Sequence, residues 1–227
     1  MSDYTDVFVV ERAKIEERLA MEVGGGLGDK KTTTDMVYGR LIVERLIRNL
    51  YGETAADFTL IQNQHVFSLA KGDQFSVYFN ISMSKKYIAV ATSVNTPVGI
   101  DIESSEELPK KALVGISNRC FSRLELSRVN TLNDQVNFRN FYRILACKEA
   151  VVSVLGNAFS SSLKKIDTTQ LDESDYITSF VENKRWKVFT RYWHNRRAGC
   201  FFALSALGHP GTIRVHQTKQ VLTSIFQ

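Results

Sequence analysis

The sequence predicts an α+β fold built from two related lobes, and three features of the chain support this prediction. It has 227 residues with 44% hydrophobic content, which is enough for one or two compact domains. Segments with the alternation of strands are interspersed with two segments of helical periodicity. Each half of the chain contains one helical segment and a few strands, without a visible sequence repeat. We therefore expect an N-terminal lobe over residues 1–104 and a C-terminal lobe over residues 105–227.

The N-terminal half begins with a predicted loop and helix. Residues 23–31 are rich in glycine and are expected to form a loop, because no strand precedes them and the G-x-G-x-x-G spacing of nucleotide sites is missing. Thr34 or Asp35 could cap the helix that follows, and Gly52 is expected to end it. Its buried face is predicted from apolar residues at three-and-four spacing: Val43, Leu46, Ile47 and Leu50.

Strands dominate the rest of the prediction. Residues 75–82 and 87–94 resemble an antiparallel hairpin, and residues 98–103 alternate as a further strand. A long helix is predicted from about residue 137 to residue 155, with Gly156 as its stop. Residues 186–193 and 199–207 are two more predicted strands, joined by the basic turn at residues 194–197.

Composition limits the class of protein. Charged residues make up 23% of the chain and there are three prolines, so the sequence has no signature of disorder. The three cysteines form no C-x-x-C pair, which favours a reducing compartment over a disulfide framework. The first residues carry acids where a signal peptide carries bases, and no apolar run reaches about 18 residues. We expect a soluble cytoplasmic protein that does not bind a membrane.

The net charge of +5 is unevenly placed along the chain. Residues 1–104 contain 11 lysines and arginines against 14 acids, whereas residues 105–227 contain 18 against 10. A basic half suggests an anionic partner such as a phosphorylated cofactor, an acidic protein or nucleic acid, and a solvated basic surface remains the alternative.

Two carboxylates share one face of the strand at residues 98–103. Because side chains alternate along a strand, Asp101 and Glu103 point to the same side, together with Gly99. Gly99 has no side chain and is expected to leave room for a ligand beside them. Like charges that lie so close favour a cation between them.

A third carboxylate, Glu149, lies on or beside the apolar stripe of the predicted long helix. An unpaired acid is costly there, so a partner is expected. One Mg²⁺ ion could serve all three carboxylates, since it prefers oxygen ligands and keeps places for substrate phosphate. The alternative pairs Glu149 with a nearby lysine or arginine and leaves the two strand acids in solvent.

The combined pattern resembles the paired signature of Sfp-type 4'-phosphopantetheinyl transferases. The segment Val98-Gly-Ile-Asp-Ile-Glu103 is similar to the [VI]-G-[IV]-D-x-E strand of that family, and Cys147-Lys-Glu-Ala150 is similar to its K-E-[AS] helix. Between them, Cys120-Phe-Ser-Arg-Leu-Glu125 resembles the F-[ST]-x-x-E segment. Upstream, Phe79-Asn-Ile-Ser-Met-Ser84 and the Gly39-Arg40 helix resemble further family segments, the latter of the enterobactin type.

The resemblance implies the family's fold, two pseudo-symmetric lobes with the active site in the cleft between them. It implies an enzyme that transfers the 4'-phosphopantetheine group of coenzyme A to a serine of an apo acyl or peptidyl carrier protein and releases 3',5'-ADP. Asp101, Glu103 and Glu149 would hold Mg²⁺, and Glu149 or a metal-bound water would act as general base. The resemblance implies Glu149, Lys148 and Asp101 as the catalytic residues. The residues expected to contact coenzyme A are Arg40, Ser82 and Lys148, with Lys30 and Lys31 as further candidates.

Three positions depart from the family pattern: Met83 replaces a phosphate-binding histidine, Ser153 stands near the place of a second lysine, and Leu145 replaces an aromatic residue. Losing two charged contacts could weaken coenzyme A binding, but neither loss removes the metal site. Carrier proteins of this class are acidic, so we expect docking on arginines of the basic half: Arg119, Arg123, Arg128, Arg196 and Arg197.

Three other functions remain open at this point. The chain could be a family member with weakened or lost activity, or another Mg²⁺-dependent phosphoryl-transfer enzyme or hydrolase. It could also be a basic nucleic-acid-binding protein, since residues 184–193 mix aromatic and basic side chains, although no nucleic-acid-binding motif accompanies them. The sequence does not identify the carrier protein, whether of fatty acid, polyketide or nonribosomal peptide synthesis. A monomer is expected, because the cleft can form within one chain.

Overall fold

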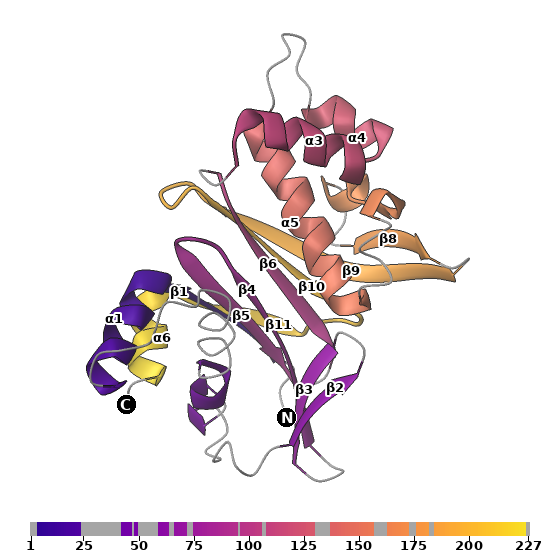
Figure 1. The fold of residues 1–227 in the computed structure, drawn as a ribbon. Coiled ribbons are helices and arrows are strands. Elements are labelled where there is room, and N and C mark those ends of the chain that lie inside the picture. Colours follow the sequence, from indigo (N-terminus) through magenta and orange to yellow (C-terminus); the bar gives the residue numbers. More distant parts are fainter. Residues whose placement is uncertain are drawn as a thin grey trace.

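The computed structural model describes residues 4–23, 42–46, 48–49, 59–63, 66–71, 75–94, 96–105, 108–129, 137–156, 163–172, 176–181 and 184–225. These residues form two sheets that lie against each other, with helices on the outer side of each (Figure 1). The predicted α+β class is confirmed.

The first sheet has the strand order β11-β1-β5-β4-β3-β2. Its strands are β1 (Tyr4–Glu11), β2 (Thr59–Asn63), β3 (Val66–Lys71), β4 (Phe75–Met83), β5 (Tyr87–Ser93) and β11 (Thr212–His216). Its outer face is covered by α1 (Arg12–Val23), by the helical residues 42–46 and by α6 (Thr218–Ile225). Ile15, Leu46 and Val221 are fully buried there, one from each of these helical segments.

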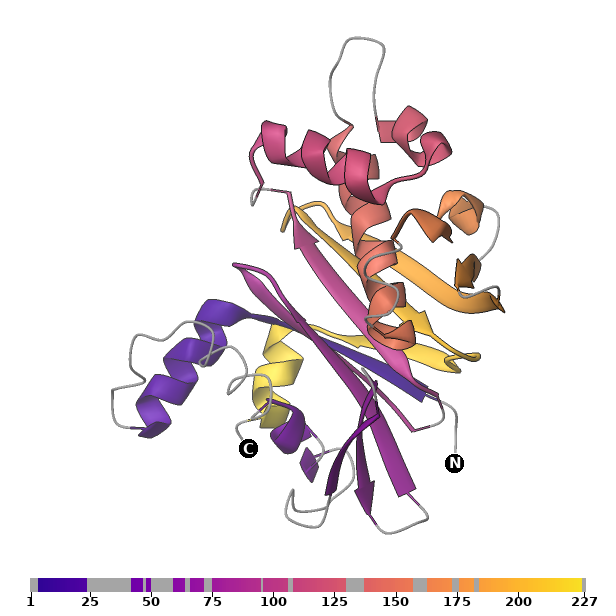
Figure 2. The same cartoon turned by 45° about the vertical axis from the view of Figure 1, so that its right-hand side comes forward.

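The second sheet has the strand order β6-β10-β9-β8-β7. Its strands are β6 (Val98–Ser104), β7 (Ile166–Asp167), β8 (Tyr176–Val181), β9 (Lys184–Asn195) and β10 (Cys200–Ala206). The helices of this half are α3 (Lys110–Cys120), α4 (Arg123–Val129), α5 (Phe138–Leu155) and the short 3-10 helix η3 (Thr169–Asp172). Helix α5 crosses the outer face of the sheet, and α3 and α4 lie at its upper end (Figure 2).

Helix α5 has clear start and stop signals. The Asn137 side chain accepts a hydrogen bond from the backbone N–H of Asn140 at 3.1 Å, which satisfies one of the free donors of the first turn. Gly156 ends the helix at φ 99°, a backbone conformation that favours glycine. The predicted helix at residues 137–155 is therefore confirmed together with its boundaries.

A third core layer lies between the two sheets. Ile100 and Ile102 of β6 and Leu204 of β10 pack against Val7 of β1 and Ala89 of β5. Because both sheets are covered on their two faces, their central strands are apolar over most of their length. Phe189 of β9 belongs to this core with 5% exposure, so it does not present a stacking surface for nucleic acid.

The division between the sheets does not coincide with the expected boundary at residue 104. Strand β6 precedes that boundary but pairs with β10 in the second sheet, and β11 returns at the end of the chain to pair with β1. The predicted strands around residues 75–82, 87–94, 98–103, 186–193 and 199–207 are confirmed as β4, β5, β6, β9 and β10. Among the residues described, no helix is long and apolar enough to cross a membrane.

Candidate active site

The carboxylates of β6 lie on the face of the second sheet that helix α5 covers. Ile100 and Ile102 are buried in the core between the sheets, so the alternating residues Gly99, Asp101 and Glu103 point to the other side. Asp101 and Glu103 are half-buried there. The predicted placement of these two acids on one strand face is confirmed.

Gly99 allows α5 to approach the strand closely. A Cβ atom at this position would overlap the carbonyl oxygen of Ala150 and would lie 2.8 Å from Val154 Cγ2 and 2.9 Å from Ser153 Cβ. The space beside Gly99 is therefore filled by the helix, which corrects the expectation that it admits a ligand. The glycine acts indirectly, because it brings α5 and Glu149 close to the acidic strand.

Ser82 of β4 orients Asp101. Its hydroxyl donates a hydrogen bond to Asp101 Oδ1 at 2.9 Å and accepts one from the backbone N–H of Ile102 at 3.1 Å. A serine hydroxyl has a single hydrogen to donate, so in this arrangement Ser82 cannot also donate to a phosphate oxygen. The structure thus assigns Ser82 to positioning an acid, where the sequence suggested a direct phosphate contact.

Asn80 makes a second link between β4 and β6. Its Oδ1 accepts a hydrogen bond from the backbone N–H of Ile100 at 2.9 Å. The two strands belong to different sheets, and Asn80 and Ser82 supply the acceptors that a neighbouring strand would otherwise provide. The Asn-x-Ser pattern therefore fixes β6, and with it Asp101, against the first sheet.

Glu149 occupies a half-buried position on α5. Burial raises the pKa of its carboxyl above the ordinary value, because the charged form loses hydration there. Cys120, at the end of α3, is close enough that the Glu149 charge contributes to the raised pKa of its thiol, after the larger effect of burial. Glu149 therefore lies on the side of α5 that faces α3.

The three acids match Mg²⁺ by the chemistry of their oxygen donors, since this ion prefers carboxylate ligands. Burial destabilises the ionised form of the Glu149 carboxyl. A cation bound nearby would stabilise that form. In the part of the chain that the structure describes, however, no three histidine, cysteine, aspartate or glutamate side chains stand close enough together to hold a metal ion. Strand β6 and helix α5 are adjacent, but the carboxylates of Asp101, Glu103 and Glu149 would have to move closer together to bind one ion.

Lys148 lies in the interior of the protein and is fully buried. Its ammonium forms an ion pair with Glu125 at 2.9 Å, donates to the carbonyl oxygen of Leu163 at 2.8 Å and donates to that of Ile166. Burial lowers the pKa of Lys148, while the Glu125 charge acts in the opposite direction. All three donors are occupied away from solvent, which speaks against the predicted phosphate contact and assigns Lys148 a structural role.

Glu125 is the centre of this buried cluster. One carboxylate oxygen accepts the backbone N–H of Ser122 at 2.7 Å, and the other accepts the backbone N–H of Thr168 at 3.0 Å and its hydroxyl at 2.7 Å. Ser122 in turn accepts the backbone N–H of Glu125 at 3.3 Å, which completes a capping box at the start of α4. Sequence reasoning noted this segment only as a resemblance and missed its function.

The other predicted site residues fall into two groups. Arg40, Lys30 and Lys31 lie outside the described residues. Met83 packs against the core under α1 and α6, on the face of β4 opposite to Ser82, and Ser153 packs against Gly99. Met83 and Ser153, which depart from the family pattern, therefore both contribute to packing.

The predicted docking arginines differ in their surroundings. Arg119, Arg123, Arg196 and Arg197 are exposed. Arg128 is half-buried and donates to the carbonyl oxygen of Thr169 at 3.3 Å. Arg128 therefore connects α4 to η3.

Two comparisons with known proteins point to the same family. A protein of Synechocystis sp. named "Putative 4'-phosphopantetheinyl transferase" is 23% identical over 121 residues, which are 53% of this chain and 48% of that protein. The aligned region thus spans about half the length of this curated relative. Residues 97–203, which contain β6, the Glu125 cluster and α5, match the family model for the 4'-phosphopantetheinyl transferase superfamily. Over these residues, just under half of the chain, the protein is similar to the 4'-phosphopantetheinyl transferase superfamily.

Proposed function

We propose that this protein is a Mg²⁺-dependent, Sfp-type enzyme that transfers the 4'-phosphopantetheine group of coenzyme A to a serine of an apo carrier protein and releases 3',5'-ADP. The family match supports transfer of this group in general. The observation that carries the proposal is the packing of α5, with Glu149, on the strand face that bears Asp101 and Glu103.

Asp101, Glu103 and Glu149 would hold the metal. Bound Mg²⁺ supplies Lewis-acid stabilisation of the charge that develops on the transferred phosphate and on the leaving group. Glu149 is also suited to accept the proton of the carrier serine, since burial brings its pKa closer to neutral pH. Ser82 keeps the Asp101 carboxylate in one orientation.

The substrates would be bound by basic residues from both halves. We infer that Arg40 and Lys31, with Lys30, contact the phosphates of coenzyme A, because an arginine fork and lysine ammonium groups suit phosphate groups. The exposed arginines Arg119 and Arg123 offer docking points to an acidic carrier protein. All of these groups come from one chain, so we expect the enzyme to act as a monomer. The three cysteines are free thiols, in keeping with a cytoplasmic location.

Mass spectrometry tests this function directly. Incubation with coenzyme A, Mg²⁺ and an apo carrier protein is expected to add one phosphopantetheine group to the carrier, and omission of Mg²⁺ is expected to abolish the gain. Asp101→Ala should lower the transfer rate roughly a thousandfold, since several kcal/mol of charge stabilisation is lost. Glu17→Ala, an exposed acid on α1, is the matched control and should transfer normally.

An unmodified carrier under all conditions would reject the transferase function. Equal rates for Asp101→Ala and the control would retain the function but reject the metal site.

A further inference from the structure

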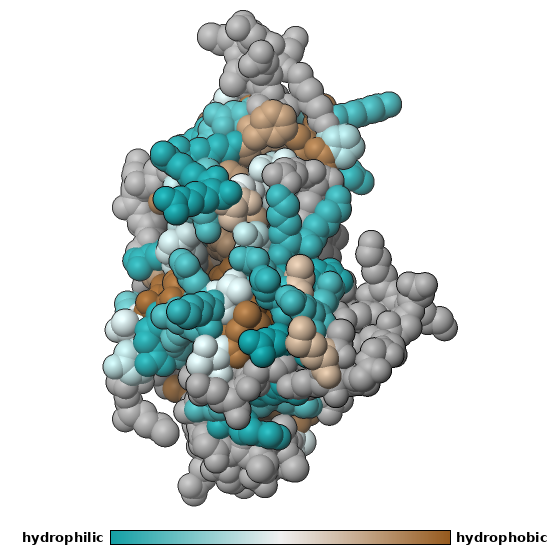
Figure 3. Space-filling view, turned by 90° about the vertical axis from the view of Figure 1, so that its left-hand side faces the viewer, coloured by the Kyte–Doolittle hydropathy of each residue, from teal (hydrophilic) through white to brown (hydrophobic). Residues whose placement is uncertain are grey.

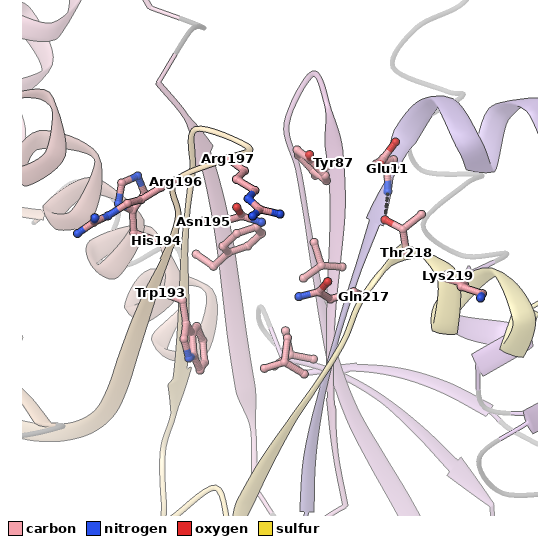
Figure 4. A pocket seen from close by; sticks show the side chains of 14 residues that line it. Glu11, Tyr87, Trp193, His194, Asn195, Arg196, Arg197, Gln217, Thr218 and Lys219 are labelled. Carbon is pink, nitrogen blue, oxygen red and sulfur yellow. Dashed lines mark hydrogen bonds between the residues drawn. The ribbon is translucent and has the colours of Figure 1, made fainter.

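A groove with a cavity volume of about 820 Å³ opens between the two sheets. One wall comes from β9, β10 and the turn between them, and the other from β1, β5, β11 and the start of α6 (Figure 4). Its volume falls within the range of roughly 300–1,000 Å³ that small-molecule sites have in proteins. Of its lining residues, Arg196 and Arg197 were among the arginines expected to dock a carrier protein, and none of the residues proposed to bind the metal or coenzyme A lines it.

The inner surface of the groove is apolar and aromatic. Val7 and Phe202 form part of it and belong to the buried core between the sheets. Val215 of the edge strand β11 is 47% exposed, and Trp193 and Tyr87 stand on opposite walls. On this side of the molecule, hydrophobic patches appear between hydrophilic residues (Figure 3). Such a surface favours a ligand with an apolar ring or chain.

Three cationic residues, Arg196, Arg197 and Lys219, are among the described lining residues. Arg197 extends from the β9–β10 turn into the gap, Lys219 lies at the start of α6, and Arg196 points to the other side of β9 (Figure 4). None of these three cations forms an ion pair with a described acidic side chain. Glu11 is the acidic residue among the described residues of the lining. The rim therefore favours a negatively charged group.

The groove is separate from the three acids. Phe202 pairs in register with Ile102, whose side chain points into the core between the sheets. Asp101 and Glu103 alternate with Ile102 and point to the opposite face, toward α5. Strands β6 and β10 thus stand between the groove and the carboxylates, so a ligand in the groove cannot contact them.

We propose that this groove is a second binding site, and that it takes an amphipathic organic anion: an apolar ring or short chain with one carboxylate, sulfonate or phosphate group. The apolar part lies against Phe202, Val215 and Trp193. The anionic group lies at the rim, where Arg197 offers its guanidinium fork and Lys219 its ammonium. Each cation contributes a charge-assisted hydrogen bond, which sets anions apart from neutral molecules of the same shape.

Two fluorescent probes with the same ring system test the site. Anilinonaphthalene sulfonate carries the anionic group, and N-phenylnaphthylamine lacks it. The full-length protein is expected to bind one sulfonate probe per chain in a saturable manner, at least tenfold more tightly than the neutral probe. Quenching of Trp193 fluorescence, measured in a Trp186→Phe background, reports occupancy of the groove itself.

Three variants separate the groove from the rest of the surface. Arg197→Ala with Lys219→Ala should weaken the sulfonate probe at least tenfold and leave the neutral probe unchanged. Val215→Glu introduces a negative charge at an exposed position and should weaken the sulfonate probe by a similar factor. Arg119→Ala with Arg123→Ala removes two exposed arginines on α3 and α4, and should bind both probes as the unmodified protein does.

The proposal is overturned if the Arg197/Lys219 variant binds the sulfonate probe as tightly as the α3–α4 control. It is equally overturned if both probes bind with the same affinity, which would indicate apolar adsorption, or if the groove is closed by a second copy of the chain, which sedimentation at the same concentration detects. Displacement of the probe by coenzyme A would contradict a site separate from the proposed transfer reaction.

Discussion

The buried pair of Lys148 and Glu125 gives one residue of the Lys148-Glu149 motif a structural role, while a chemical role is proposed for its neighbour. Lys148 and Glu149 are adjacent in the sequence, yet helical geometry turns one into the core and the other toward α3. Lys148 fixes the segment at residues 163–168 and α4 to α5. The position of Glu149 therefore depends on its neighbour.

Removing the charge of Lys148 should be strongly destabilising. Lys148→Met keeps most of the side-chain volume but leaves the Glu125 carboxylate buried without its cation, which costs about 3–5 kcal/mol. Urea unfolding measures this loss. Lys14→Met breaks an ion pair of two side chains that are each 54% exposed, and should cost about 0–1 kcal/mol.

A compensating variant makes this prediction specific. Glu125→Gln added to Lys148→Met leaves no buried charge and keeps an acceptor for Thr168, so it should recover much of the lost stability. The free energy of unfolding of the Glu125→Gln single variant completes the comparison. If the losses of the two single variants add up to the loss of the double variant, the two residues are not coupled.

Glu149 predicts a dependence of stability on pH. Burial raises the pKa of its carboxyl, so the folded chain binds this proton more tightly than the unfolded chain. Its contribution is fully present below the unfolded pKa and is lost as the pH rises through the folded pKa. Glutamine does not ionise, so Glu149→Gln keeps its stability as the pH rises. The difference in the free energy of unfolding between this variant and the unmodified protein should therefore grow between the unfolded and the folded pKa of Glu149.

Thermal unfolding over a pH series, without divalent ions, measures the advantage of Glu149→Gln. A constant difference at all pH values would contradict the raised pKa. Adding Mg²⁺ at neutral pH should reduce the difference, because a cation that binds the ionised carboxylate stabilises only the unmodified protein.

At the scale of single residues, the sequence predicted that Asp101 and Glu103 share one face of their strand. It did not predict the hydrogen-bond partners of Lys148 or Ser82. Alternation along a strand follows from local geometry, which a short segment encodes. The Ser122 to Glu125 capping box is also a local pattern and was available to sequence reasoning. The Glu125 to Thr168 contact joins residues 43 positions apart, and a single sequence carries no signal for such a pairing.

At the scale of elements, the contact of α5 with β6 decides the geometry of the site. Gly99→Ala places a methyl group against the backbone of Ala150 and must push the helix from the strand. Overpacking of this kind costs about 1–3 kcal/mol or more. We expect lower stability in urea and a lower transfer rate by mass spectrometry.

Gly115→Ala is the matched control for this substitution. Gly115 lies within α3 and an added Cβ meets nothing within 4 Å, so alanine should stabilise the protein by about 0.5–1 kcal/mol through its better helix propensity. If both glycine variants are equally stable and equally active, the close approach of α5 is not required.

Elements that follow a local pattern were predictable, and others were not. The long helix and the hairpin of β4 and β5 follow the expected periodicities. Strand β1 has Val7 in the core between the sheets and Phe8 under the outer helices, so its apolar run lacks alternation. Strand β11 pairs with β1 across about 200 residues, and no local pattern indicates that partner.

At the scale of the whole molecule, the first and the last described strands, β1 and β11, pair with each other. Asp6 of β1, which is buried, accepts hydrogen bonds from Arg214 at 2.7 and 2.6 Å and contacts His216 at 2.7 Å, which holds the last strand to the first. Asn80 and Ser82 join the two sheets. Because pairing rather than chain order defines the sheets, β6 from residues 1–104 belongs to the second sheet and β11 from residues 105–227 belongs to the first.

The central claim is that Asp101, Glu103 and Glu149, from a strand and the helix packed on it, bind one divalent ion. The most direct measurement is a crystal structure grown with coenzyme A and Mn²⁺, in which anomalous scattering locates the metal. We predict a single ion with oxygens of all three carboxylates at ligand distance, about 2.1–2.2 Å for an ion of this size. An ion held by other residues, or Asp101 and Glu149 on separate ions, would contradict the claim.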